Sequence, residues 1–351
     1  MALGQPWHRT GRLLIVVIGL AVSVAVQGVA ADNRASDPRF EEVEASAASM
    51  ERLHSLLVLV DGEPRVERVF RGGDLETPVN IKSLSKTVLS ALVGAAIQEG
   101  VLSGVDQSIA DALGDRLPPD ADPAVADITI GHLLSMQSGL ERTSGANYGT
   151  WVASSDWVTD ALRRPMVGEP GGRMRYSTGN SHVLSAALVA QSGQATLNLA
   201  RQWLGAPLNI RIPDWLRDPQ GVHFGGNEMR LSPRALARFG ELYRLGGEIG
   251  GQRVLAEDWI DASWTPRGRS RFTNDGYGYG WFITELGGER AYYGWGFGGQ
   301  LLYVIPDLGM TVVMISDPNP PSPGGAYRRQ LERLVSDMLI PAVQGDGATS
   351  P

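Results

Sequence analysis

A serine and a lysine stand three residues apart in the run Ser83-Leu84-Ser85-Lys86. On a helix this spacing places both side chains on the same face. A serine hydroxyl is a weak nucleophile until a base accepts its proton, and a desolvated lysine amine can be that base. A helix start also offers backbone N–H groups to a developing oxyanion. The run therefore predicts nucleophilic catalysis, with two solvated residues at an ordinary helix start as the alternative.

The use of lysine in this chain favours a catalytic role for Ser83 and Lys86 over that of two solvated residues. Lys82 and Lys86 are the only lysines among 31 basic residues, and all the others in that count are arginines. A chain that otherwise relies on arginine thus keeps both of its amines beside Ser83. Any chemistry that needs a lysine amine must take place at this one position.

The elements that must position these residues are strands at the two ends of the chain and helices between them. Apolar or alternating runs predict strands over 53–60, 65–70, 277–284, 290–293, 300–305 and 310–316. Helical spacing predicts helices over 83–98, 132–136, 151–162, 181–191, 233–245 and 327–339. This order predicts an α+β fold, in which one antiparallel sheet flanked by helices is interrupted by a helical insertion.

The same order predicts how the chain is divided. We assign residues 40–110 together with 250–343 to a sheet-containing half and residues 111–249 to a helical half. Residues 344–351 are predicted to be a disordered tail. The helical half would form one wall of the active site and the acyl pocket, and the strand around 294–299 would form the other wall.

Composition excludes several classes of protein. The chain has 351 residues, 43% of them hydrophobic, which suits one large domain or two linked ones. Its net charge of −7 argues against binding nucleic acid or anionic membranes through bulk charge. The absence of cysteine excludes disulfides, thiolate metal sites and a cysteine nucleophile. The five histidines show no metal-ligand spacing, so we predict neither a metal nor another cofactor.

Three further features are interpreted as structural. Gly294, Gly296 and Gly299 fit the spacing of a dinucleotide fingerprint, but a strand is predicted after them where that fingerprint needs a helix. His132 stands at a predicted helix start beside two leucines and is interpreted as a hydrogen-bonding residue of the fold. His182 follows Tyr176 by six residues and is given the same interpretation.

The first residues have the composition of a targeting segment. A basic start with Arg9 and Arg12 precedes an apolar or small run from Leu13 to Val26, and small residues continue to Ala31. This order is typical of a secretory signal peptide, and the run is shorter than the roughly 20 apolar residues of a spanning helix. We predict a signal peptide over 1–31 and export to the bacterial periplasm or the medium. An uncleaved N-terminal membrane anchor is the alternative, and no other stretch is apolar enough for stable membrane insertion.

Several stretches together resemble the serine β-lactamase and penicillin-binding superfamily, especially its class C-like esterase and amidase branch. Ser83-Leu84-Ser85-Lys86 is similar to the first motif of that family. Residues 128–140 resemble its segment around Ser-Gly-Leu, and residues 169–180 resemble the stretch that ends in its Tyr-Ser-Asn motif. The resemblance extends over residues 40–340 with the same order and spacing. It implies a β-lactamase/DD-peptidase-like fold.

The resemblance also implies a role for each matching residue. Ser83 matches the acylated nucleophile, and Lys86 matches its general base. Tyr176 matches the second acid–base residue, which returns a proton to the leaving group and later helps to activate water. A tyrosine with a pKa near ~10 needs a nearby cation to act at neutral pH, and we expect Lys86 to supply it. The backbone N–H groups of Ser83 and Phe297 would form the oxyanion hole.

The sequence departs from the family pattern in two places. Thr178 stands where the Tyr-Ser-Asn motif has asparagine, so the amide that orients the substrate is lost or is supplied by Asn180. The third motif, Lys-Thr-Gly or His-x-Gly, is best matched by Gly294-Trp295-Gly296, which has no cation. We expect Trp295 and Gly296 to contact the substrate, with simple packing on the sheet as the alternative for Trp295. The missing cation favours the branch that contains 6-aminohexanoate-dimer hydrolases and esterases.

Three functions stay open from the sequence. The first is an exported serine hydrolase that acts on a small-molecule ester or amide through an acyl-enzyme. The second is a β-lactamase or D-alanyl-D-alanine carboxypeptidase, in which Arg173 or Arg175 would restore the binding of a substrate carboxylate. The third is a penicillin- or peptidoglycan-binding module, against which intact Ser83, Lys86 and Tyr176 argue. No nucleic-acid partner is predicted, and no pattern defines an oligomeric state.

Overall fold

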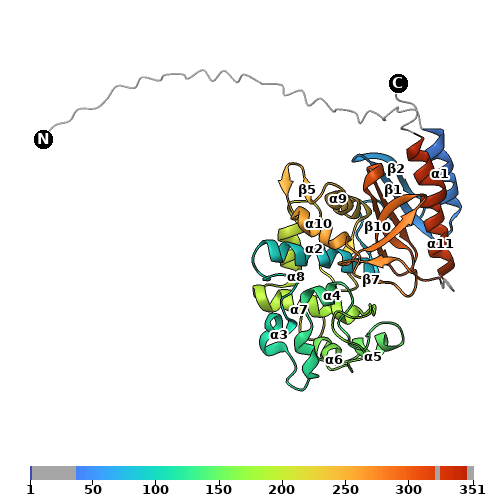
Figure 1. Ribbon diagram of the computed structural model, residues 1–351. Coiled ribbons are helices and arrows are strands. Elements are labelled where there is room, and N and C mark those ends of the chain that lie inside the picture. The colour runs from blue at the N-terminus through green and yellow to red at the C-terminus, as the bar shows by residue number, and fades with distance from the viewer. Residues whose placement is uncertain (2–36, 321–324, 346–351) are drawn as a thin grey trace. The chain divides into compact units, whose positions relative to one another are not determined.

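The computed structural model describes Met1, residues 37–320 and residues 325–345 (Figure 1). Apart from Met1, the predicted signal peptide over 1–31 lies outside these residues, and so does the predicted tail after Gly345. Residues Asp37–Pro351 form one unit by their internal contacts. None of the described helices is both long and apolar enough to span a bilayer.

An eight-stranded sheet is the frame of this unit, with the strand order β2-β1-β12-β11-β10-β9-β8-β7. All of its neighbouring strands pair in the antiparallel direction. The strands are β1 (Leu53–Val60), β2 (Glu63–Val69), β7 (Gly268–Arg269), β8 (Gly276–Tyr277), β9 (Phe282–Leu286), β10 (Glu289–Gly296), β11 (Gln300–Ile305) and β12 (Met310–Ser316). This sheet, flanked by helices, confirms the predicted α+β fold.

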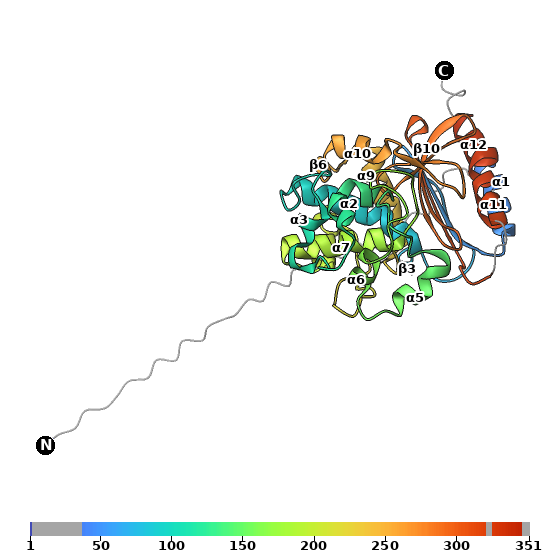
Figure 2. The same cartoon turned by 60° about the horizontal axis from the view of Figure 1, so that its bottom comes forward.

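Helices cover both faces of the sheet. On one face α1 (Pro38–Ser49) lies beside α11 (Ala326–Arg333), as Figures 1 and 2 show. The opposite face is covered by α9 (Pro233–Arg244) and by the start of α2 (Ser85–Gln98). Every residue of β11 and β12 is buried because both faces are covered, which explains why these strands appear in the sequence as uninterrupted apolar runs.

Between β2 and β7 the chain is mainly helical (Figure 2). Its α-helices after α2 are α3 (Ile109–Leu113), α4 (Ile130–Leu134), α5 (Tyr148–Val152), α6 (Trp157–Leu162), α7 (Thr178–Ser192), α8 (Thr196–Ala200), α9 and α10 (Glu257–Trp264). Two small strand pairs interrupt them, β3 (Val79–Asn80) with β4 (Arg230–Leu231) and β5 (Glu248–Ile249) with β6 (Gln252–Arg253). Short 3₁₀ or π turns are η1 (Lys82–Leu84), η2 (Gly114–Arg116), η3 (Pro123–Asp127), η4 (Gly145–Asn147), η5 (Arg201–Gly205), η6 (Pro306–Leu308) and η8 (Leu334–Leu339).

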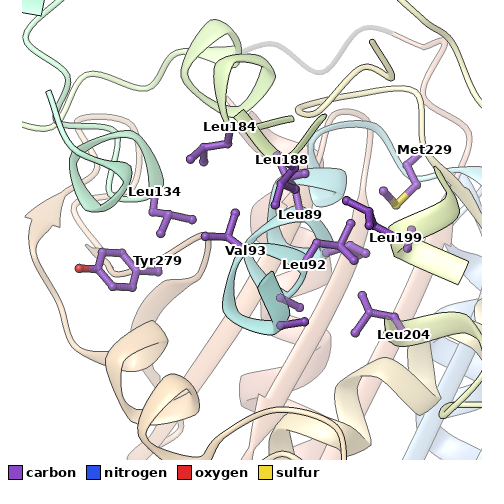
Figure 3. Packing of buried hydrophobic residues seen from close by; sticks show 14 of the residues in the cluster. Leu89, Leu92, Val93, Leu134, Leu184, Leu188, Leu199, Leu204, Met229 and Tyr279 are labelled. Atoms are coloured by element: carbon purple, nitrogen blue, oxygen red, sulfur yellow. The ribbon is translucent and has the colours of Figure 1, made fainter. Parts of the chain in front are cut away.

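Helices α2 and α7 form the centre of the helical region. Figure 3 shows Leu89 and Val93 of α2 in the same buried cluster as Leu184 and Leu188 of α7. Both helices are buried along most of their length, so neither has the exposed face of a surface helix. Their positions are therefore fixed by packing on every side. The residues at their N-terminal ends are held by a rigid core.

The predicted helix over 151–162 is wrong, because the structure has two short helices there. The first, α5, ends at Val152, and the second, α6, begins at Trp157. The Asp156 carboxylate accepts a hydrogen bond from the Thr159 N–H at 2.9 Å and so starts a new helix. The apolar residues before and after the break keep helical spacing, so the periodicity of the sequence does not reveal it.

The predicted strand over 277–284 is also wrong, because it is a hairpin of β8 and β9. The Gly278 N–H donates to the Trp281 carbonyl at 3.0 Å, and Gly280 adopts a positive φ of 79°. Only glycine takes that conformation without strain, and a Cβ at Gly280 would also lie 2.8 Å from the Ser90 Cβ of α2. The aromatic residues around this turn disguise it as a continuous strand.

Two predicted elements are longer in the structure. The strand predicted over 290–293 is β10, which continues to Gly296. The helix predicted over 327–339 is α11, which runs through the π turn η8 into α12 (Ile340–Gln344). The additional residues of β10 include Gly294 and Gly296, and glycine is unfavourable in strands. The structure shows that these glycines are required by the close approach of β10 to the start of α2.

Candidate active site

Ser83 lies in the 3₁₀ turn η1, between β3 and α2. Lys82, the residue before it, has a positive φ of 53°, which is unfavourable for a residue with a side chain. The Asn80 side chain holds this conformation by accepting a hydrogen bond from the Lys82 N–H at 2.9 Å. The Ser85 hydroxyl donates to the Lys82 carbonyl at 2.5 Å from the other side. The turn that presents Ser83 is therefore strained and held by its neighbours, as is common at functional sites.

Lys86 is buried, with 3% of its surface exposed, and its amine faces Ser83. The Lys86 Nζ donates to the Ser83 Oγ at 3.1 Å and to the Gly226 carbonyl oxygen at 2.5 Å. Burial lowers the pKa of Lys86 from 10.5 to about 7, because the charged amine is desolvated. Within the described part of the chain no carboxylate pairs with this amine. A large share of Lys86 is therefore neutral near pH 7 and can accept a proton from Ser83.

Lys82, the other lysine, has a different environment. Its amine lies 3.6 Å from a carboxylate oxygen of Glu228, and the Asn80 side chain donates to the same carboxylate at 2.6 Å. Both lysines are thus near Ser83, as their positions in the sequence predict. Only Lys86 directs its amine at the serine hydroxyl, so only Lys86 has the geometry of a base.

Tyr176 comes immediately before α7 and faces Ser83 across the site. Burial raises the pKa of its phenol to about 12, and the Ser83 hydroxyl, which faces the phenol, opposes this rise. The Lys86 Nζ lies 5.0 Å from the centre of the Tyr176 ring. Lys86 thus lies near Tyr176, as expected of the cation that this tyrosine needs, while burial keeps the pKa of the phenol raised. At neutral pH the phenol keeps its proton and is suited to donate it.

The segment before α5 holds the start of α7 in place. The Thr143 Oγ1 accepts a hydrogen bond from the Gly179 N–H at 2.7 Å, and the Ser144 Oγ accepts one from the Thr178 N–H at 2.9 Å. The Thr143 N–H donates to the Ser177 hydroxyl at 3.1 Å. These bonds satisfy N–H groups that a helix start would otherwise leave without a partner. They also fix the backbone next to Tyr176.

Strand β10 forms the opposite wall of the site. A Cβ at Gly294 would collide with the Leu84 side chain, and a Cβ at Gly296 would collide with the Ile81 carbonyl oxygen. The two glycines therefore allow β10 to lie directly against η1. Phe297 follows at the turn between β10 and β11, with 66% of its surface exposed. Phe297 and Ser83 line the same cavity.

A cavity of about 290 Å³ opens beside the Ser83 hydroxyl. Its walls are mainly aromatic and are formed by Tyr176, Phe272, Phe282, Trp295 and Phe297. Arg142, Ser144 and Gly145 complete the lining. The structure thus brings together Ser83, Tyr176, Trp295 and Phe297, which sequence analysis singled out, with Lys86 directly behind Ser83.

Two predicted substrate contacts do not reach this cavity. Asn180 is buried in α7, where its Oδ1 accepts a hydrogen bond from the Ser138 hydroxyl at 3.1 Å, and it does not line the cavity. Thr178, which replaces the motif asparagine, is also buried and bonds to the Ser144 hydroxyl. Gly296 faces η1 and not the cavity. The Asn180 side chain instead bonds to the Ser138 hydroxyl inside the fold.

Several residues of the site were missed by sequence analysis. Phe272 lies in the β7–β8 loop, and Phe282 is the first residue of β9. Arg142 lies two residues after the segment 128–140, which resembles the family around Ser-Gly-Leu. The Gly226 carbonyl, which accepts from Lys86, is a backbone atom and has no signature in the sequence. The spacing of Arg142 after residues 128–140 is the one signal that could have indicated a site residue.

The histidines have structural roles. The His132 side chain closes a capping box with Thr129 at the start of α4, as its position predicts. His182 is fully buried, and its Nε2 lies 2.9 Å from a carboxylate oxygen of Asp218. The Gly225 N–H donates to the Nδ1 of His182 at 3.5 Å, so this pair supports the segment that holds Lys86. Across the described residues, no group of three His, Asp or Glu side chains could hold a metal ion.

Comparison with known proteins assigns this fold and site to a class. A family model described as Beta-lactamase matches residues 50–337, which is more than half of the chain, and the chain therefore belongs to the beta-lactamase family. Proteins similar to this chain include a 6-aminohexanoate-dimer hydrolase, an amidohydrolase and a carboxylesterase.

Individual relatives extend this comparison. The chain is 24% identical over 267 residues to a 6-aminohexanoate-dimer hydrolase of Paenarthrobacter ureafaciens, and the match covers 68% of this chain and 66% of that protein. The chain thus spans slightly less than two thirds of the length of this relative.

Solved structures with low sequence identity share the fold. EstCE1, described as a hydrolase with promiscuous acyltransferase activity, has a TM-score of 0.67 at 19% identity. The match covers 85% of this chain and 98% of the EstCE1 chain. A penicillin-binding protein homolog from Caulobacter crescentus has a TM-score of 0.67 at 18% identity, covering 86% and 96%. A D-stereospecific amidohydrolase from Streptomyces sp. has a TM-score of 0.65 at 16% identity, covering 84% and 98%.

Proposed function

We propose that this protein is a serine hydrolase that cleaves ester or amide bonds through an acyl-enzyme on Ser83. One observation carries this proposal. The Lys86 amine, whose pKa burial lowers to about 7, lies 3.1 Å from the Ser83 hydroxyl at the edge of an aromatic cavity. A lysine that is merely structural would gain stability from a carboxylate partner. Here the amine donates to a hydroxyl and a carbonyl and lies over the Tyr176 ring, and no carboxylate among the described residues pairs with it, which suits proton transfer.

The mechanism is a double displacement. Neutral Lys86 accepts the Ser83 proton while the Ser83 Oγ attacks the substrate carbonyl carbon. The N–H groups of Ser83 and Phe297 stabilise the resulting oxyanion. The bond to the leaving group then breaks as Tyr176 donates its proton to the departing atom, and Tyr176 recovers a proton from Lys86. In the second half, water attacks the acyl carbon and gives a proton to the same pair. The bond between that carbon and the Ser83 Oγ then breaks, the pair returns the proton to the Oγ, and the acid leaves.

The aromatic cavity supports a substrate with an apolar part beside the scissile bond. Phe282 and Trp295 lie with their ring centres 6.1 Å apart, and the exposed Phe272 and Phe297 stand at its edge. A cavity of about 290 Å³ fits a small acyl or aromatic group. The names of similar proteins, namely a 6-aminohexanoate-dimer hydrolase, a D-stereospecific amidohydrolase and a family VIII carboxylesterase, support an amide or ester as the bond that is cleaved.

The proposal is tested by ester hydrolysis with purified protein lacking residues 1–31. We expect hydrolysis of 4-nitrophenyl butyrate, and a loss of at least about 10³-fold in kcat for Ser83→Ala. Ser103→Ala, an exposed serine outside the site, is the matched control. A butyryl adduct on Ser83, found by mass spectrometry after rapid acid quench, would identify the acyl-enzyme. Equal rates for Ser83→Ala and the unchanged protein would refute the mechanism.

A second candidate is β-lactam or D-alanyl-peptide hydrolysis. Arg142 favours it, because this arginine lines the Ser83 cavity and can bind the carboxylate of such a substrate. Nitrocefin turnover and acylation by penicillin distinguish the candidates. Fast nitrocefin turnover would assign the protein to β-lactamases, and acylation without turnover would assign it to penicillin-binding proteins.

We also propose that the protein is exported. Residues 1–31 have the basic start, apolar run and small residues of a signal peptide. Expression of the full chain in a bacterial host, followed by fractionation and N-terminal sequencing, tests this. A periplasmic product that starts near Asp32 is expected, whereas an intact membrane-bound product would indicate the uncleaved anchor.

A further inference from the structure

A second cavity adjoins the Ser83 cavity and has a different character. Its volume is about 280 Å³, and it shares Tyr176 and Arg142 with the Ser83 cavity. Three more arginines line it, namely Arg173, Arg175 and Arg271. A chain with a net charge of −7 thus gathers four arginines around a cavity that adjoins the one containing Ser83. We call this cavity the arginine pocket.

The positive charge of the arginine pocket is poorly compensated. Its one acidic lining residue, Glu141, already pairs with Arg164 at 3.2 Å, outside the pocket. Arg142, Arg173 and Arg271 form no ion pair with any of the residues that the structure describes. Such a group of like charges in a concave site attracts an anion.

The two walls of the Ser83 site differ in the charge that they offer. On the β10 wall Trp295 and Phe297 are apolar, and Arg142 is the one charged residue lining the Ser83 cavity among the described residues. Arg142 stands where the two cavities meet. A substrate that lies along both cavities therefore meets aromatic rings near Ser83 and guanidinium groups beyond Tyr176.

We propose that the arginine pocket binds a carboxylate of the substrate while the apolar part of the substrate lies in the aromatic cavity. This inference rests on the proposed function and defines its substrate class as amphiphilic carboxylate esters or amides. Guanidinium groups suit a carboxylate because their paired N–H donors match its two oxygens. Arg142 and Arg173 bind this group from one wall, and Arg271 binds it from the β7–β8 loop.

Three 4-nitrophenyl esters test the proposal by turnover. 4-Nitrophenyl butyrate is neutral, mono-4-nitrophenyl succinate has a carboxylate on the acyl group, and 3-carboxy-4-nitrophenyl butyrate has one on the leaving group. After correction for intrinsic reactivity, we expect kcat/KM to be at least about tenfold higher for one carboxylate ester than for the neutral ester. Hydrolysis of the neutral ester that depends on Ser83 reports on the proposed function separately.

The variants test whether the pocket causes the preference. In the double variant Arg173→Gln/Arg271→Gln, we expect the preference for the carboxylate ester to fall by about tenfold. The double Arg→Lys variant should retain part of it, because it keeps the charge but loses the paired donors. Arg211→Gln, an exposed arginine outside both cavities, is the matched control and should keep the preference. A preference that survives loss of both arginines, or no preference at all, would overturn the proposal.

A binding experiment tests the pocket without turnover. In Ser83→Ala protein, calorimetric titration compares 4-phenylbutyrate with the neutral 4-phenylbutanamide. We expect the carboxylate to bind at least about tenfold more tightly, and the difference to disappear in Arg173→Gln/Arg271→Gln. Equal affinity for the two compounds would refute the pocket even if Ser83-dependent esterase activity is found. Binding of the carboxylate without esterase activity would support the pocket and refute the proposed function.

Discussion

The two walls of the candidate active site differ in the chemical types of their residues. The helical wall, formed by the starts of α2 and α7, carries Ser83, Lys86 and Tyr176, and two of these have pKa values strongly shifted by burial. The β10 wall carries Gly294, Trp295, Gly296 and Phe297, none of which titrates. In the proposed mechanism, proton transfer is therefore confined to the helical wall. The β10 wall contributes shape and backbone N–H groups, and this separation allows specificity to change without a change in the chemistry.

The largest expected effect comes from removing the base of the helical wall. Lys86→Met keeps the aliphatic stem and deletes the amine, so ester turnover should fall by about 10³-fold or more. The unfolding temperature should stay the same or rise, because a buried amine without a counter-charge is costly. Lys82→Met, at the other lysine, is the matched control and should lose far less activity. Thermal melts and ester kinetics check both statements, and substantial turnover in Lys86→Met would remove the lysine from the mechanism.

A smaller but still large effect is expected from the backbone of the β10 wall. In Gly296→Ala the new Cβ would collide with the Ile81 carbonyl and lie 3.1 Å from the Lys82 Cβ, so η1 must shift. We expect kcat/KM to fall by about 10²-fold and stability to fall by about 1–3 kcal/mol. Gly149→Ala is the control, since a Cβ there meets no atom within 4 Å. Unchanged kcat/KM in Gly296→Ala would show that the close contact between β10 and η1 is not needed to position Ser83.

The smallest expected effect is the change of kcat/KM with pH. This change distinguishes the two walls, because only the helical wall carries the groups that titrate. With the Lys86 pKa at about 7, kcat/KM should rise about tenfold per pH unit below 7 and level off above it. The Tyr176 pKa of about 12 predicts no loss of the acid before strongly alkaline pH. A profile that is flat from pH 6 to pH 8 would contradict the assignment of Lys86 as the base.

The same shift predicts how stability depends on pH. The pKa of Lys86 is about 7 in the folded protein and near 10.5 in the unfolded chain, so the unfolded chain binds more protons between these values. The contribution of Lys86 to the free energy of unfolding therefore increases as pH rises from about 7 to about 10.5, by at most about 1.4 kcal/mol per pH unit. Denaturant melts of the unchanged protein and of Lys86→Met isolate this contribution, which the variant should lack.

The sequence predicted the bounds of strands correctly where both faces of the strand are buried. β1, β11 and β12 have their predicted bounds, because strands in the middle of a covered sheet are continuous apolar runs between turn residues. The prediction was wrong at the β8–β9 hairpin and at the break between α5 and α6. There a tight turn and a capping side chain interrupt runs that keep their periodicity. Local hydrogen bonds determine where the chain turns at these two positions, and a hydrophobic pattern does not reveal such bonds.

The site was predicted from sequence only in part. Ser83 and Lys86 are one helical turn apart, so their geometry follows from their spacing, and the resemblance to a family added Tyr176. The Gly226 carbonyl and Arg142 reach the site through the fold, far along the chain from Ser83 or in loops whose course the sequence does not define. The direction of the pKa shift of Tyr176 depends on its enclosure, which only the three-dimensional arrangement determines.

The pairing of β1 with β12 has a consequence for how the protein folds. Leu56 pairs with Met314, so two neighbouring interior strands of the sheet come from opposite ends of the folded unit. Such distant contacts are slow to form, because the intervening chain must be closed into a loop first. During synthesis the sheet cannot be completed until Met310–Ser316 has been made, whereas α2 and α7 can pack earlier. A premature stop before β12 should therefore abolish the folded state as a whole and leave an exposed, aggregation-prone edge at β1.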